Sequence, residues 1–212
     1  MFSDMTFDDL NKMVGTKKSI PYETYFSNTG LSDKQKENRI SLAKKMEEKF
    51  TYAMILLFTM AQYSKAIDYE SVRAIFETGY LAAITGTIDV DDYIESYVKQ
   101  FSYDIIDSTK KHDSDPYYYS KDRVKLISEN ESQTSWNYQE YVDAKNSGKT
   151  KKKWRDIRDK RERETHRKVG GTVLPIGEPF LVGDSLMYYP KDTSLGASDE
   201  EIANCRCSIK YF

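Results

Sequence analysis

The feature that most constrains the fold of this chain is a long periodic run of apolar residues near its start. Between residues 31 and 67, apolar side chains return every three or four positions on a strongly charged background, which is the spacing of one face of an α-helix. The longest apolar stretch, 52–61, has about half of the ~20 residues that a membrane span needs. The run therefore predicts a buried core helix and no membrane anchor. The predicted core face comprises Ile40, Ala43, Met46, Phe50, Met54, Leu57 and Ala61.

Three later segments also carry helix signals. Residues 68–86 and 120–148 each end at a glycine, and residues 89–112 begin with acids and end with basic residues. Basic side chains at that end suit the negative pole of the helix dipole. Ser32 or Asp33 can cap the first helix. The sequence thus predicts four helices before residue 149.

Beyond Gly170 the pattern changes. Short apolar pieces alternate with Pro and Gly up to about residue 198, which is typical of short strands joined by tight turns. A helix start at Ser198 and a strand-like ending follow. These patterns predict an α+β protein: a mainly helical N-terminal part, 1–118, and a small α+β C-terminal domain with short strands, 119–212.

Basic residues are concentrated in one segment, 149–168. It holds eleven Lys and Arg against four Asp and Glu, whereas the whole chain has a net charge of −2. A basic segment on an otherwise acidic chain focuses the electrostatic field in one place. We expect this segment to form one basic helix from Thr150 to about Arg167.

The residues leave three interpretations of this helix open. Its charges can pair with each other in solvent, as Asp156 with Lys160 and Asp159 with Arg163. His166 among arginines can act as an acid or base on a phosphodiester. The helix can also bind nucleic acid, because each neutralised phosphate releases counterions. The expected phosphate contacts are Lys149, Lys151, Lys152, Lys153, Arg155, Arg158, Arg161 and Arg167, with Trp154 as a packing anchor.

The two cysteines of the chain, Cys205 and Cys207, stand one residue apart. With no cysteine framework and no secretory-signal pattern in the first residues, a reducing compartment is expected. Residues two apart on a strand point to the same side, so both thiols can face a core. They can also join His166 in a zinc site, with Asp159 or Asp192 as a fourth ligand, although C-x-C is not the spacing of a zinc knuckle. We expect the buried role, keep zinc as the alternative, and expect no other cofactor.

An ordered set of motifs runs from Arg123 to Cys207. They are Arg123, Ile127, Glu131, Asn137, Lys152-Lys153-Trp154, Asp159 to His166, Gly171, Pro175 to Phe180, Tyr189 to Asp192 and Asn204-Cys205-Arg206-Cys207. In order and spacing this set resembles the C-terminal domain of phage head-morphogenesis proteins, the Mu protein F-like minor head proteins of tailed phages. The N-terminal helices are similar to that family only in kind.

The resemblance implies a structural virion component and not an enzyme. It implies a minor head protein inside the capsid, formed in the host cytoplasm, that acts in head assembly and in DNA packaging or ejection. The implied partners are the portal protein, the scaffold or major capsid protein, and packaged double-stranded DNA; residues 1–118 would serve portal or capsid association. Domains of this type are also joined to toxin modules, so a nuclease-like or toxin-related enzyme using His166 and nearby arginines is the alternative.

The resemblance does not assign a chemical role to the motif residues, and we expect structural ones. Partly buried charges need partners, so Asp159 and Glu131 should pair with Arg161, Arg163 or Arg206. His166 should form hydrogen bonds between a helix and the strands. The expected structural set is Glu131, Trp154, Asp159, Arg161, Arg163, His166, Asn204, Cys205, Arg206 and Cys207.

Overall fold

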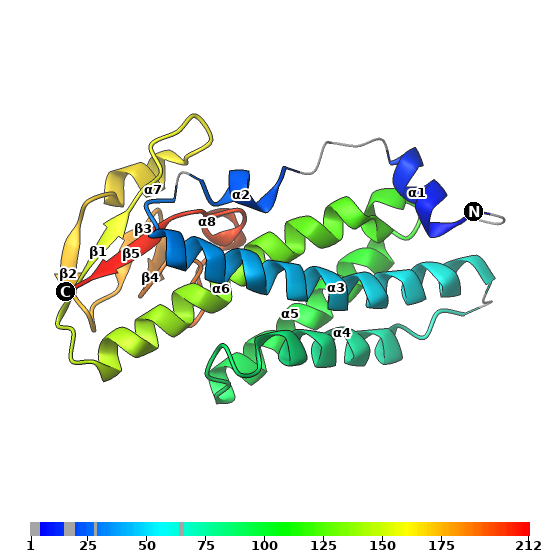
Figure 1. The fold of residues 1–212 in the computed structure, drawn as a ribbon, viewed down its shortest axis with the longest axis horizontal. Helices are drawn as coiled ribbons and strands as arrows, with labels where there is room; N and C mark the ends of the chain where they lie inside the picture. The colour runs from blue at the N-terminus through cyan, green and yellow to red at the C-terminus, as the bar shows by residue number, and fades with distance from the viewer. Residues whose placement is uncertain (1–4, 15–19, 28, 64–65) are drawn as a thin grey trace. The chain divides into compact units, whose positions relative to one another are not determined.

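The computed structural model of the chain describes residues 5–14, 20–27, 29–63 and 66–212 (Figure 1). It divides into two compact units, Met1–Ile20 with Ser41–Glu129, and Pro21–Ile40 with Asn130–Phe212. Helices dominate the chain up to residue 146, and the short strands all follow it, as the sequence predicts. The α+β fold class is therefore confirmed. Within the described residues, no helix combines the length and apolar character that a bilayer span requires. The expected domains 1–118 and 119–212 stay a prediction.

Helices build the first unit. α4 and α5 lie side by side (Figure 1), and their starts are capped by Asp68 and Asp91, whose carboxylates accept backbone N–H groups of the first turn. Two long helices, α3 and α6, contribute residues to both units. Ser32 and Gln35 form a reciprocal capping box at the start of α3. The elements are α1 (Phe7–Met13), α3 (Asp33–Tyr63), α4 (Tyr69–Ile84), α5 (Asp92–Lys111), the 3-10 helix η1 (Pro116–Tyr119) and α6 (Lys121–Asn146).

The core of the first unit is apolar and aromatic. The predicted face of α3 is buried through Ala43, Met46, Phe50, Met54 and Leu57. The ring of Phe50 stacks on that of Phe76, with centroids 4.3 Å apart. The predicted core helix is therefore confirmed. Its stability comes from burying this continuous apolar stripe.

Two small antiparallel sheets characterise the second unit. One has the strand order β2-β1-β5, with β1 in the centre, and the other is the β3–β4 hairpin (Figure 1). Gly183 lies in the hairpin turn with φ +59°, a conformation that suits glycine. The elements are α2 (Tyr22–Tyr25), β1 (Lys151–Arg155), α7 (Glu164–Val169), β2 (Val173–Pro175), β3 (Phe180–Val182), β4 (Ser185–Met187), α8 (Asp199–Ile202) and β5 (Ser208–Tyr211).

The expected basic helix from Thr150 to Arg167 is wrong. Residues 151–155 form β1, a loop follows, and only the short α7 is helical. In the loop, side chains take the backbone N–H groups that a helix would need: Glu162 accepts from Ile157 and Arg158, and Asp159 accepts from Arg161. Such local hydrogen bonds compete with helix formation.

Candidate nucleic-acid interface and a buried histidine–cysteine cluster

The central strand β1 separates its residues by face. Lys152 and Trp154 are buried, whereas Lys151 is exposed and Lys153 and Arg155 are half-buried. This alternation follows from the strand geometry, in which successive side chains point to opposite faces. β1 therefore presents Lys151, Lys153 and Arg155 on one face of the sheet.

Lys153 and Lys210 lie directly opposite each other on β1 and β5. Like charges in this position repel and destabilise the strand pair. Within the described part of the chain, Lys151, Lys153 and Lys210 form no ion pair with a carboxylate. We call these three residues the lysine face. Lys210 is missed by the sequence prediction, although the alternation in the final strand-like segment places it on the side opposite the buried Ile209.

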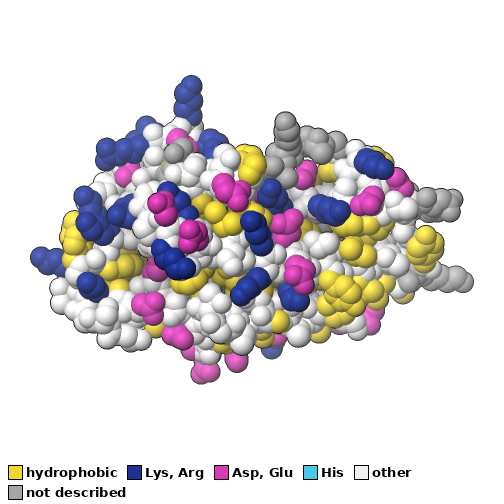
Figure 2. All heavy atoms as spheres, viewed as in Figure 1, with side chains coloured by type: hydrophobic (Ala, Val, Ile, Leu, Met, Phe, Trp, Pro, Cys, Tyr) yellow, Lys and Arg dark blue, Asp and Glu magenta, His cyan; other side chains and the backbone are white. Residues whose placement is uncertain are grey.

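The loop after β1 adds exposed basic residues, and Figure 2 shows Lys and Arg side chains over this part of the chain. Arg158 and Arg161 are exposed. Several basic residues here are already paired: Arg158 with Asp156, Arg167 with Glu162, and Lys168 with Glu164. Arg155 donates to the carbonyl of Gly30. Neither of the expected helix pairs is present, because Asp156 binds Arg158 and Asp159 binds Arg206.

Lys152 does not belong to this surface. Its ammonium group is buried, donates to the carbonyl of Tyr188 at 2.8 Å and lies over the rings of Tyr141, Phe180 and Tyr188. Burial lowers the pKa of Lys152 from 10.5 to about 8. The expected phosphate contact at Lys152 is therefore corrected, and the other expected contacts, Lys149 among them, are exposed or half-buried.

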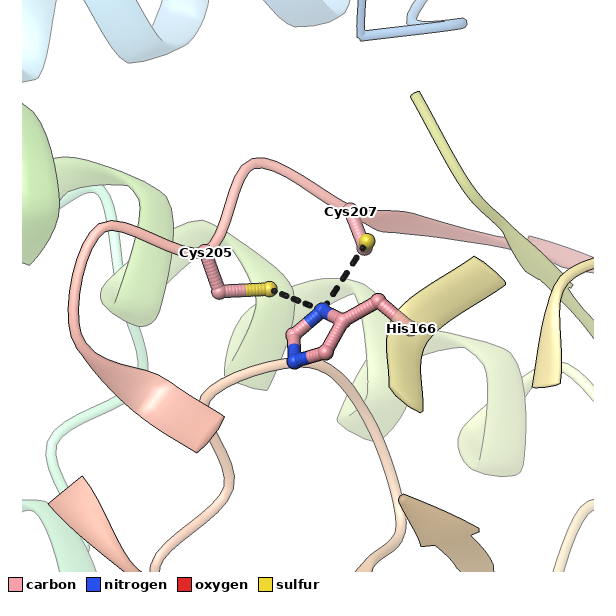
Figure 3. Close-up of side chains that lie close together, drawn as sticks. All are labelled: His166, Cys205 and Cys207. Atoms are coloured by element: carbon pink, nitrogen blue, oxygen red, sulfur yellow. Dashed lines mark hydrogen bonds between the residues drawn. The ribbon is translucent and has the colours of Figure 1, made fainter. Parts of the chain in front are cut away.

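A cluster on the opposite side of β1 joins His166 of α7 to the segment between α8 and β5. The Nδ1 atom of His166 lies 3.4 Å from Cys207 Sγ and 3.5 Å from Cys205 Sγ (Figure 3). All three side chains are buried, and Trp154 packs edge-on against the imidazole. The structure thus brings together the three residues that the sequence suggested for zinc.

Glu201 contacts the other ring nitrogen of His166. Its Oε2 lies 2.9 Å from Nε2 and also accepts a hydrogen bond from Thr165. Burial alone would lower the pKa of His166, but the hydrogen bond to Cys205 and the charges of Cys205 and Glu201 raise it. The hydrogen bond between the thiols lowers the pKa of Cys205 and raises that of Cys207.

The expected fourth metal ligands lie elsewhere. Asp159 receives both hydrogen bonds of an ion pair with Arg206, at 2.8 and 2.7 Å. Asp192 accepts the backbone N–H groups of Tyr188 and Ser194. Among the described residues, no fourth His, Cys, Asp or Glu joins the cluster of three. Both aspartates are corrected as ligands, since their carboxylates already have other partners.

The remaining motif residues brace the same segment. Arg163 donates to the carbonyl of Ala203 at 2.5 Å. Asn204, in the left-handed conformation with φ +54°, exchanges hydrogen bonds with the side chain of Asn130. Glu131 is buried on α6. The contacts of Arg163 and Asn204 hold the backbone directly before the cysteines.

The chain matches one protein family. The family described as Phage Mu protein F like protein matches residues 76–210. No curated protein and no solved structure matches the chain. The match extends well upstream of Arg123, where the sequence resemblance begins, and includes α5 and α6 in full.

Proposed function

From the premise that the chain belongs to the Phage Mu protein F like family, which acts in phage head morphogenesis, we propose that it is a minor head protein inside the capsid. It associates with the portal protein, and with scaffold or major capsid protein, during assembly in the host cytoplasm. There it contacts packaged double-stranded DNA, without sequence preference, in packaging or ejection. The observation that carries the DNA contact is the lysine face, Lys151, Lys153 and Lys210.

The lysine face supports DNA contact on electrostatic grounds. A folded chain rarely benefits from two lysines opposite each other on neighbouring strands, but a phosphate backbone placed over them relieves the repulsion. Its neutralisation also releases counterions from the DNA. The neighbouring residues Val173 and Phe212 are also exposed. The lysine face is therefore accessible to a partner.

A salt titration tests this contact. We would measure binding of fluorescent double-stranded DNA at several salt concentrations for the native chain and for K151Q/K153Q/K210Q. Losing three phosphate contacts should lower the slope of log affinity against log salt by about three. The matched control is K34Q/K45Q/K99Q, which removes the same charge from exposed lysines of α3 and α5.

The outcomes separate the hypotheses. If the control binds like the native chain and the lysine-face variant binds weakly with a shallow slope, the proposed surface is supported. Equal slopes for both variants would show that binding depends on net charge and not on this face. No binding at low salt would remove the DNA contact and leave the morphogenesis role in place.

Two measurements test the virion role. Mass spectrometry of purified virions should detect the chain after nuclease and protease treatment of the particles, because a protein inside the capsid is protected. Co-expression with the portal protein encoded by the same phage should yield a complex on gel filtration. A chain removed by protease from intact particles would contradict the internal location.

The enzyme alternative lacks a supporting observation. His166 is only 2% exposed and both of its ring nitrogens have partners. A general acid or base must reach a proton of the substrate within hydrogen-bond distance. We therefore propose that the role of His166 is structural.

A further inference from the structure

The geometry points to a zinc site formed by His166 Nδ1, Cys205 Sγ and Cys207 Sγ. These three atoms lie within 4.8 Å of one another, and all three residues are buried. Thiolate and imidazole are the donors that zinc prefers in proteins. The site lies apart from the lysine face and does not depend on DNA binding.

The distances agree with a shared ion. In a tetrahedral site with Zn–S near 2.3 Å and Zn–N near 2.0 Å, a sulfur and a nitrogen ligand lie about 3.5 Å apart. The two observed separations from Nδ1 are 3.4 and 3.5 Å. One ion between the three atoms is therefore compatible with both nitrogen–sulfur separations.

Hydrogen bonding to a neutral imidazole accounts for only one of the two sulfur contacts. Glu201 is a carboxylate that accepts from Nε2–H, which leaves the lone pair of a neutral imidazole on Nδ1. That single lone pair faces two sulfur atoms (Figure 3), and it can accept from only one thiol. A cation bound to Nδ1 and to both sulfurs uses all three donor atoms.

Glu201 has the position of an outer partner of a metal ligand. Histidines that bind metals usually donate their second N–H to a carboxylate, which fixes the ring and its tautomer. The carboxylate is itself held by Thr165 Oγ1, and a side chain at Gly183 would collide with its Oε1 atom. The ring orientation is thus fixed before any ion binds.

Charge also favours the ion. Two thiolates and Zn²⁺ together are neutral, which removes the cost of burying separate charges. Among the described residues, His166, Cys205 and Cys207 are the three His, Cys, Asp or Glu ligands that converge here.

Such an ion would connect distant parts of the second unit. His166 lies on α7, whereas the cysteines lie just before β5, about forty positions later in the chain. The segment between them contains only three-residue strands and the four-residue α8. Small elements with little core gain stability from a bound metal.

Metal analysis of the untagged chain, purified after expression with zinc, tests the site. The native chain should carry about one zinc per molecule, and C205S/C207S should carry almost none. The matched control is H112Q, because His112 is the other histidine of the chain and is exposed. H112Q should retain the metal, whereas H166Q should lose it.

Because the variants can fail to fold, the native chain provides a second measurement. Its metal is removed by a chelator under reducing conditions, and Co²⁺ is added. Binding to both thiolates should give sulfur-to-cobalt charge-transfer bands, weaker in C205S and in C207S, and should protect both thiols from a thiol reagent. Zinc should displace the cobalt.

Three results would overturn the site. The native folded chain could bind far less than one zinc or cobalt per molecule after reconstitution. Bound cobalt could lack thiolate bands. Metal could also remain at full occupancy in folded C205S/C207S, which would place it at other residues.

Discussion

The two units of this chain are stabilised by different kinds of side chain. The first buries mainly apolar and aromatic residues, such as Phe50 stacked on Phe76, and few charged residues, such as Arg123. The second buries many polar and charged residues, among them Arg39, Lys152 and His166. An apolar core tolerates changes of shape if volume is kept, whereas a buried charge requires its particular partners. The units should therefore respond differently to substitution.

The largest expected effect is in the second unit, at Arg39. Its guanidinium makes two hydrogen bonds to the Glu140 carboxylate, at 2.8 and 3.0 Å, and further bonds to Gln133 and Asn137. R39M leaves the buried Gln133 and Asn137, and the half-buried Glu140, without this donor. We expect the free energy of unfolding in urea to fall by about 3–5 kcal/mol.

The control is an ion pair of the first unit. Arg73 pairs with Glu70 on one side of α4, where the glutamate side chain is 75% exposed. R73M should cost about 0.2–1 kcal/mol, because exposed pairs contribute little. An R39M cost no larger than that of R73M would show that the buried network is not what stabilises the second unit.

The next effect concerns the apolar core. Met46 is fully buried on α3. M46A should cost about 2–5 kcal/mol, because it removes apolar contacts and leaves a cavity. M46L keeps the volume and should cost less than about 1.5 kcal/mol. Urea unfolding of both variants measures this difference, and equal costs would mean that the site depends on the shape of methionine and not on buried volume.

The first unit could be predicted largely from sequence because its core repeats. The stripe from Ala43 to Leu57 has the helical period, and α3 forms where that period indicates. The starts of α4 and α5 also follow from the aspartates before them. Local patterns were sufficient here, since each helix buries one continuous apolar face.

The second unit was less predictable because its buried residues look like surface residues. Three of the five residues of β1 are lysines, and only Lys152 among them is buried. Nothing in the local sequence distinguishes it from its two neighbours. The network of Arg39 was missed, although Gln133, Asn137 and Glu140 share one helix face by their spacing. From sequence alone, a helix face of Gln, Asn and Glu is expected to be exposed to solvent, because the buried partner Arg39 lies about a hundred residues away. The proximity of His166 to the cysteines depends on contacts some forty residues apart, which no local pattern fixes.

Lys152 offers a pH test of the buried charge. In the folded chain its pKa is about 8, against an ordinary value of 10.5. Below pH 8 both the folded and the unfolded chain hold the proton, and folding bears the full cost of burying the ammonium. Between pH 8 and 10.5, Lys152 loses its proton in the folded chain but keeps it in the unfolded chain, so the free energy of unfolding rises with pH. Relative to K152M, the native chain should gain stability from pH 8 to 10.

The comparison with K152M isolates this residue, because the other groups that titrate in the same range are common to both chains. Urea midpoints at successive pH values provide the measurement. A constant difference between the two chains across this range would mean that Lys152 keeps an ordinary pKa when folded.

The smallest expected effect is the repulsion between Lys153 and Lys210, and a double-mutant cycle measures it. Opposed like charges should give a destabilising coupling of about 0.2–1 kcal/mol at low salt, and it should vanish near ~1 M salt, where the screening length is about 3 Å. K153T, K210T and the double variant complete the cycle. The contact of Lys210 with the Phe212 ring is lost in both variants that lack Lys210, so it cancels.

DNA affinity of the same variants should change in the opposite direction. A charge that destabilises the free sheet strengthens contact with phosphate, so K210T should be the more stable chain and the weaker DNA ligand. If the coupling is zero or favourable, the lysines do not repel each other, and the electrostatic argument for the lysine face fails. If the coupling is repulsive but DNA affinity is unchanged, Lys210 does not contact DNA, and the proposed surface is wrong at this residue.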